Sequence, residues 1–72
     1  MPFSREQLRQ IFTYHAPDAD QTIAYEKLRN AAYDFAVALV ELTPSSADQT
    51  AAVRKLRECV MTANASIALK GQ

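Results

Sequence analysis

The chain has 72 residues, 49% of them hydrophobic, and its eight basic residues balance its eight acidic residues. This length suits one domain, and the absence of net charge argues against broad, non-specific DNA binding, which needs a basic face. A single cysteine cannot form an intrachain disulfide, and with a single histidine it makes a poor metal site, so we expect no metal and no cofactor.

The first predicted element is a short helix over residues 5–12. Ser4 precedes it as the N-cap, and Gln7 stands at the third helical position, which is the pattern of a capping box. Its apolar residues follow at helical spacing: Leu8, Ile11 and Phe12. Two turns of helix are marginal without a partner, so we expect this helix to cover part of the remaining structure.

A long helix is predicted next, over residues 19–43. Pro17 breaks the preceding helix, and Asp18 with Gln21 repeats the capping pattern. Pro44 ends the long helix, since helices usually stop at or before the residue that precedes a proline. Apolar residues in steps of three and four form a heptad-like seam along it: Tyr25, Leu28, Ala32, Phe35, Leu39 and Leu42.

The third predicted helix covers residues 47–69, after Ser46 as the cap. Gly71 is well placed to end it in a left-handed turn. Cys59 is expected to be a buried, reduced thiol on this helix. The seam of the third helix consists of Val53, Leu56, Val60, Ala63 and Ile67.

These elements predict an all-α fold, in which the short helix is followed by a long antiparallel helical hairpin, because the loop between the long helices is short. We expect one helical-hairpin domain over residues 1–72. Two packed helices bury only one side of each other, so apolar residues outside the seam need another surface to bury them. These are Ile23, Val40, Met61 and Leu69. A homo-oligomeric helical bundle would supply that cover.

Catalytic chemistry is missing from the pattern, and we expect no enzyme. The single histidine, His15, lies in a loop far in sequence from Cys59, and the acidic residues are scattered singly along the helices. One glycine cannot build a glycine-rich phosphate loop. The start of the third helix, at Ala47 and Asp48, lacks the basic character of a DNA-recognition helix, and no run is long enough to span a membrane.

The segment over residues 12–17 does not look like scaffold. Tyr14 and His15 offer flat faces for stacking and polar edges for hydrogen bonds, while Arg29 and Lys27 follow as cations suited to phosphate. Aromatic faces beside cations are what a nucleotide needs. The candidate ligand-binding residues are Tyr14, His15, Arg29, Lys27, Thr13 and Asn64.

Simpler roles for these residues remain open. Tyr14 would also serve to plug a junction between helices, and His15 would also serve as a loop residue with a satisfied ring. Arg29 would also serve as a solvated charge beside Glu26, and Asn64 as a link between helices of an oligomer. By composition alone, the residues indicate a binding surface and no particular ligand.

Three strings carry a family resemblance: IFTYHAP (11–17), YEKLRNAA (25–32) and LRECVMTANASIA (56–68). They resemble a widespread group of small phage proteins that is similar to the phage anti-CBASS protein 2 family. That family shares its helical hairpin with one type of Thoeris anti-defence sponge. The resemblance extends over nearly the whole chain.

The resemblance implies a hexameric helical sponge that binds cyclic di- or trinucleotides and does not cleave them. It would act in the cytoplasm of the infected bacterial host, where it withholds the messenger of CBASS-type or Thoeris-type defence. By resemblance, Tyr14 stacks on a base and Arg29 meets phosphate. His15 and Ala65 depart from the family pattern, and Ala65 replaces an arginine that serves a trinucleotide site, so cyclic dinucleotides are favoured. A helical protein–protein interaction module of a phage or prophage is the alternative.

Overall fold

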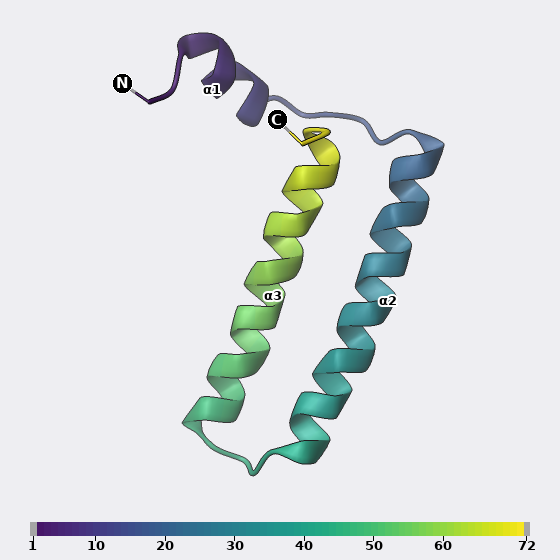
Figure 1. The fold of residues 1–72 in the computed structure, drawn as a ribbon, viewed down its shortest axis with the longest axis vertical. Coiled ribbons are helices and arrows are strands. Elements are labelled where there is room, and N and C mark those ends of the chain that lie inside the picture. Colours follow the sequence, from purple (N-terminus) through teal and green to yellow (C-terminus); the bar gives the residue numbers. More distant parts are fainter. Residues whose placement is uncertain (1, 72) are drawn as a thin grey trace.

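A computed structural model describes residues 2–71, and this part of the chain is all-helical, as predicted. Helix α1 covers Arg5–Ile11, α2 covers Ala19–Leu42 and α3 covers Ala47–Ala68. Each helix ends one residue before its predicted end. Figure 1 shows α2 and α3 as long neighbouring rods that run in opposite directions, with α1 beyond the end of α3.

The first two helices begin at the predicted capping boxes, and both boxes are complete. Ser4 Oγ accepts from the Gln7 amide at 3.1 Å, while Gln7 Oε1 accepts from the Ser4 amide at 2.8 Å. At the start of α2, Asp18 Oδ1 accepts from the Gln21 amide at 2.8 Å, and Gln21 Oε1 accepts from the Asp18 amide at 3.0 Å. These bonds satisfy amide groups that have no partner within the helix.

The hairpin turn over residues 43–46 is closed from the side of α3. The Gln49 side-chain Nε2 donates to the backbone carbonyls of Val40 and Thr43, both at 3.1 Å. Carbonyls in the last turn of a helix lack intrahelical partners, so Gln49 satisfies the end of α2. Ser46 caps α3 by accepting from the Gln49 amide at 3.1 Å. Gln49 therefore connects the two helices as well as starting the second one.

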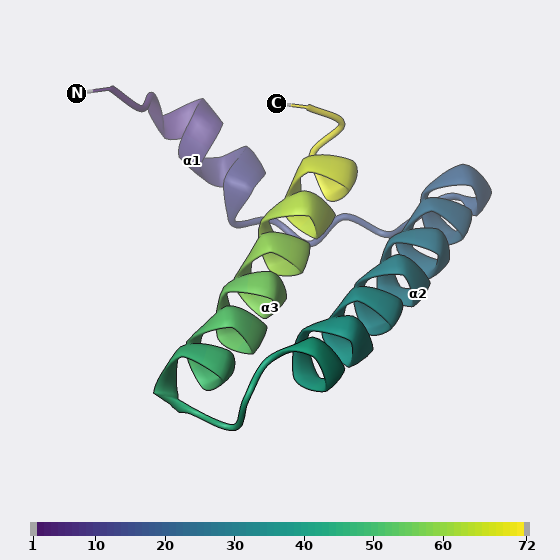
Figure 2. The same cartoon turned by 60° about the horizontal axis from the view of Figure 1, so that its bottom comes forward.

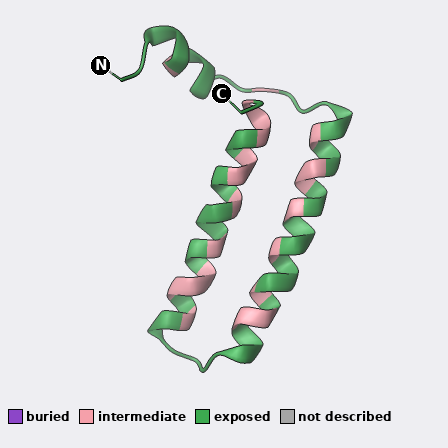
Figure 3. Cartoon of the chain, viewed as in Figure 1, coloured by how far each residue is buried: buried purple, intermediate pink, exposed green. Residues whose placement is uncertain are grey.

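The facing sides of α2 and α3 carry half-buried residues, and Figure 3 shows these as pink stripes that face one another. All five predicted seam residues of α3 are half-buried, as are Tyr25, Leu28, Ala32 and Leu39 on α2. Phe35 and Leu42 are not, because they are 57% and 83% exposed. A straight helix drifts by about 20° per heptad from a 3.5-residue repeat, so these two positions rotate away from the contact line.

No residue between positions 2 and 71 is buried in the single chain. The off-seam residues behave accordingly: Ile23, Val40 and Met61 are 51%, 53% and 60% exposed, and Leu69 is half-buried. In these residues no helix is long and apolar enough to cross a membrane. Because no residue in this range is buried, the two helices of the hairpin share one contact surface and enclose no core.

Helix α1 does not cover the hairpin, contrary to expectation. Within the described residues only α2 and α3 pack on each other, and Figure 2 shows α1 set off to one side of the C-terminal end of α3. Its Phe12 is 83% exposed. The linker over residues 12–18 carries α1 outward before α2 begins, so a helix of two turns cannot reach back along the rods.

The expectation of a buried Cys59 is also wrong, because this thiol is exposed. Cys59 immediately precedes the seam residue Val60, and adjacent residues of a helix point about 100° apart. The neighbouring apolar letters in the sequence belong to different faces of α3. In the single chain, Cys59 lies outside the α2–α3 contact.

The C-terminal end of α3 closes in a left-handed turn, as predicted from Gly71, but the turn includes Lys70 as well. Gly71 has φ 81° and Lys70 has φ 53°. The Gly71 amide donates to the Ser66 carbonyl at 3.0 Å, and the Lys70 amide donates to the Ile67 carbonyl at 3.2 Å. This pair of bonds is the Schellman motif, whose left-handed residue is most often glycine.

Candidate functional site

The linker between α1 and α2 presents an exposed aromatic ring. The side chain of Tyr14 is 83% exposed, so one or both faces of its ring are open to a partner. The neighbouring Thr13 hydroxyl donates to the Arg9 carbonyl at the end of α1. Thr13 therefore finishes a helix with its own polar group, while Tyr14 keeps its ring available for stacking.

His15 is half-buried and holds the linker against α1. Its Nε2 lies 2.7 Å from the Gln10 carbonyl oxygen. Since a carbonyl can only accept, Nε2 is the donor in this contact. This bond sets the orientation of the imidazole beside Tyr14, and it confirms part of the satisfied-ring alternative.

A pocket of about 490 Å³ brings together the end of α1, the linker, the start of α2 and the end of α3. The linker contributes Tyr14 and His15, the start of α2 contributes Asp18 and Gln21, and the end of α3 contributes Lys70. The remaining lining residues are Gln10, Ala16, Ala68 and Leu69. The pocket offers an aromatic face, a carboxylate, an ammonium group and amides, which is a set suited to a polar, planar ligand.

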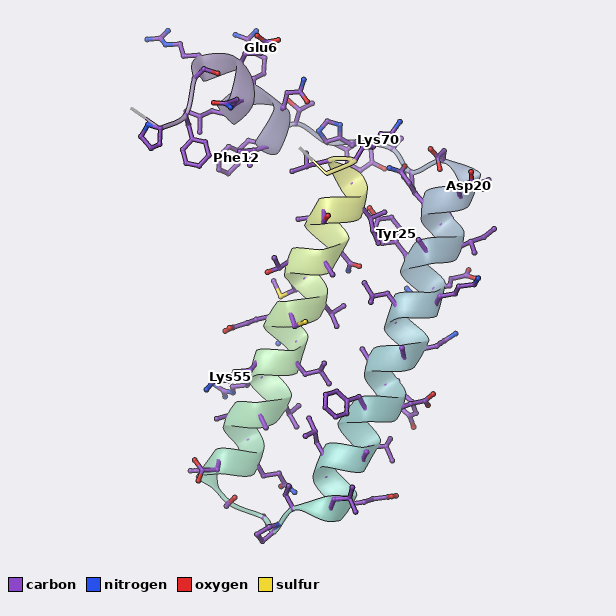
Figure 4. The ribbon with its side chains drawn as sticks, in the orientation of Figure 1. Glu6, Phe12, Asp20, Tyr25, Lys55 and Lys70 are labelled. Atoms are coloured by element: carbon purple, nitrogen blue, oxygen red, sulfur yellow. The ribbon has the colours of Figure 1, made fainter. Side chains whose placement is uncertain are left out.

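Two hydrogen bonds fix the walls of this pocket to each other. The Gln21 Nε2 group donates to the Ile67 carbonyl at 2.9 Å, and the Tyr25 hydroxyl donates to the Asn64 carbonyl at 3.5 Å. Figure 4 shows Tyr25 between α2 and α3, and Lys70 at the end of α3 above it. The start of α2 and the end of α3 are thereby held in register, which positions the turn at Lys70.

The other predicted site residues lie elsewhere. Arg29 and Lys27 are exposed on α2 and line neither this pocket nor a second pocket between α1 and the end of α3. At a rise of 1.5 Å per residue, Arg29 lies about 16 Å along the helix from Asp18. Asn64 is half-buried in the α2–α3 seam, where its carbonyl accepts from Tyr25. A single chain therefore unites Tyr14 with His15 and leaves Arg29, Lys27 and Asn64 outside their pocket.

Lys70 was missed by reasoning from the sequence. It is distant from Tyr14 along the chain, and only the antiparallel hairpin brings both residues to the same end of the molecule. A signal was present, because the glycine after it indicated a left-handed turn there. What that turn faces depends on the position of the linker, which no local pattern specifies.

A second pocket, of about 390 Å³, lies between α1 and the end of α3. Its lining is mostly apolar and includes Phe3, Ile11 and Leu69. Gln10 and Leu69 line both pockets, so the two hollows adjoin. Within residues 2–71 no cluster of three or more His, Cys, Asp or Glu side chains has the arrangement of a metal site.

Comparison with models of protein families identifies the family of this chain. The family model described as "Acb2/Tad1, hairpin domain" matches residues 4–68. The chain belongs to this family. Searches among curated proteins and among solved structures gave no match. The match to the Acb2/Tad1 hairpin covers α1, the linker with Tyr14 and His15, and both long helices, and it ends before Lys70.

Proposed function

We propose that the protein is a phage-encoded sponge for cyclic oligonucleotide second messengers, cyclic dinucleotides above all. It sequesters the messenger without cleaving it, and so blocks CBASS-type or Thoeris-type defence in the cytoplasm of the infected bacterium. Membership of the Acb2/Tad1 hairpin family supports this proposal. The observation that carries it is Tyr14, an 83% exposed ring beside a pocket of about 490 Å³.

Stacking on Tyr14 would supply the base contact. An aromatic ring contributes roughly 1–3 kcal/mol per base and tolerates different bases, because every base has a π-face. His15 adds a second ring whose orientation is set by its bond to Gln10. Arg29 would supply the phosphate contact, since its guanidinium group forms paired charge-assisted hydrogen bonds with phosphate oxygens.

We further propose that the site forms between copies of the single hairpin domain. Tyr14 and Arg29 do not share a pocket in one chain, so a ligand that meets both would lie where two chains meet. The area of the chain supports this, because 6090 Å² is exposed for a mass of 8.0 kDa. A compact monomer of this mass exposes about 4,500 Å². A hexamer, as the family resemblance implies, would cover the difference.

Sequestration sets an affinity requirement. To compete with a receptor, a sponge needs nanomolar binding or tighter, on the order of −12 kcal/mol. Two stacked bases supply only part of this, so the desolvated arginine–phosphate bonds must supply much of the rest. A preassembled helical oligomer helps, because little of the protein has to become ordered on binding.

Titration calorimetry with a panel of cyclic di- and trinucleotides tests the proposal, with Tyr14→Ala and Arg29→Ala as variants. We expect tight binding of at least one cyclic dinucleotide, weakened about tenfold or more in each variant. Tyr14→Phe keeps the stacking ring and should bind nearly as well as the unsubstituted chain. Arg54→Ala removes an exposed arginine of α3 and is the matched charge control.

The fate of the ligand separates a sponge from an enzyme. Chromatography of the ligand released on heating should recover the intact cyclic nucleotide. Linear products would overturn the sponge reading, and so would the absence of binding to every nucleotide by a folded, oligomeric protein.

A protein-interaction module is the second candidate, favoured by the exposed apolar side chains of Phe12 and Leu42, each 83% exposed. Absorbance of the purified protein near 260 nm distinguishes the two, because the chain has no tryptophan and three tyrosines. Excess absorbance from a co-purified nucleotide supports the sponge. Its absence, together with no binding in the titrations, supports the interaction module.

A further inference from the structure

The C-terminal turn of α3 brings Lys70 into the lining of the pocket that contains Tyr14. We propose that Lys70 contacts the base of the bound nucleotide and favours guanine, an inference that rests on the proposed function. Lys70 lies beyond the residues matched by the family model, which end at position 68, so the match does not assign it a role. The assignment depends on the lining of the pocket, which joins Lys70 to Tyr14, His15 and Asp18.

The backbone at Lys70 is in a conformation that lysine rarely adopts. Its φ of 53° lies in the left-handed region, where a Cβ atom crowds the neighbouring carbonyl. Glycine would close the same Schellman turn without that crowding. A cap alone therefore does not account for a lysine at this position, whereas a contact made by its side chain would.

The turn is also fixed relative to the rest of the pocket. The Ile67 carbonyl accepts from the Lys70 amide at 3.2 Å and from the Gln21 side-chain Nε2 at 2.9 Å. Gln21 in turn completes the capping box with Asp18. One chain of hydrogen bonds thus joins the turn of Lys70 to the wall that carries Asp18, so the site is largely ordered before the ligand arrives.

The pocket pairs Asp18, an acid, with Lys70, a base, and such a balanced pair suits a neutral nucleobase. Asp18 lines it with a carboxylate that accepts from the Gln21 amide at 2.8 Å through Oδ1. A phosphate placed here would be attracted by Lys70 but repelled by that carboxylate, whereas a base is neutral and can donate an N–H group to the second oxygen of Asp18. The Tyr14 ring in the same pocket is suited to stacking on a base. The phosphates of the ligand would then lie outside this pocket, toward Arg29 of another copy.

Lysine distinguishes guanine from adenine by donor and acceptor pattern. Guanine presents two adjacent acceptors, O6 and N7, and both can take hydrogen bonds from one ammonium group. Adenine presents N7 beside an amino group, which is itself a donor and meets the ammonium group unfavourably. Lys70 should therefore give the pocket a preference for guanine over adenine.

Titration calorimetry on the full chain tests this inference, with cyclic di-GMP and cyclic di-AMP as the probes. The unsubstituted protein should bind cyclic di-GMP about tenfold more tightly. Lys70→Met keeps the length of the side chain, and it should lose about that factor for cyclic di-GMP with little change for cyclic di-AMP. Lys70→Arg should retain the preference. Lys55→Met is the matched control, an exposed lysine far from Lys70 on α3 (Figure 4).

Lys70→Gly separates binding from folding. It removes the side chain and also relieves the left-handed backbone, so its melting temperature should rise while its preference for guanine disappears. A purely structural Lys70 would not give this combination.

Equal affinity of Lys70→Met and the unsubstituted chain for both probes would overturn the inference and leave the sponge proposal intact. An equal loss for both probes would also overturn it, because that result indicates a phosphate contact. Failure of the unsubstituted chain to bind any cyclic nucleotide in the panel would overturn the sponge proposal and this inference together.

Discussion

Gln21 performs three tasks with one residue. Its amide donates to Asp18 Oδ1, its Oε1 accepts from the Asp18 amide at 3.0 Å, and its Nε2 donates to the Ile67 carbonyl at 2.9 Å. Local spacing predicted the first two bonds, because the capping box needs only four consecutive residues. The third crosses to α3, 46 residues away, and depends on the hairpin.

Gln21→Ala should lower the free energy of unfolding by about 1–2 kcal/mol, because it removes half of a capping box and an interhelical bond. Urea denaturation followed by far-UV circular dichroism measures this change. Gln7→Ala removes the corresponding capping group from α1, which packs on neither long helix, and should cost less. Equal effects of the two substitutions would contradict the role of the bond to Ile67.

Among the elements, the hairpin turn shows how a repeated starting pattern takes two forms. Asp18 with Gln21 and Ser46 with Gln49 have the same spacing, but only the first pair forms a complete capping box. The Gln49 side chain turns to the carbonyls of Val40 and Thr43. The reason is geometric, since Pro44 ends α2 beside the start of α3 and leaves unpaired carbonyls within reach.

Gln49→Ala should lower the free energy of unfolding by about 1 kcal/mol, because two carbonyls at the end of α2 lose their donor. These carbonyls remain accessible to water, which limits the loss in free energy of unfolding. Thermal unfolding followed at 222 nm should show a lower midpoint than for Gln10→Ala, a control on α1 far from this turn. A midpoint equal to that of the control would show that water replaces Gln49 without loss.

At the scale of the whole molecule, the main feature is a large exposed surface with no enclosed core among residues 2–71. The two long helices share one contact stripe, and no residue from 2 to 71 is fully buried. Ile23, Val40 and Met61 lie outside that stripe with half or more of their surface exposed. At roughly 25 cal/mol per Å² of apolar area, the proposed association of copies would supply hydrophobic stabilisation that the single chain lacks.

Val40→Glu should weaken the proposed assembly, because it places a charge on a surface that another copy would dehydrate. Size-exclusion chromatography with light scattering should show a smaller mass at micromolar concentration than for the unsubstituted chain. Lys55→Glu changes an exposed residue that is already charged and should leave the mass unchanged. A monomeric unsubstituted protein would contradict the assembly outright.

The sequence by itself determined the helices, their starts and the hairpin, because caps, prolines and helical spacing are local properties. Capping at Ser4 and Asp18, the stop before Pro44 and the turn at Gly71 all depend on neighbours within a few residues. It also indicated Tyr14 and His15 as neighbours in a site, since both lie in one short linker.

Only the tertiary structure decided which faces meet and what surrounds Tyr14. Phe35 and Leu42 leave the seam because small angular drifts accumulate along a helix, and Cys59 is exposed because it lies one position from the contact line. Lys70 enters the pocket because an antiparallel hairpin returns the end of α3 to the linker. Such contacts join residues far apart in the chain, and no local pattern contains the position of one helix relative to another.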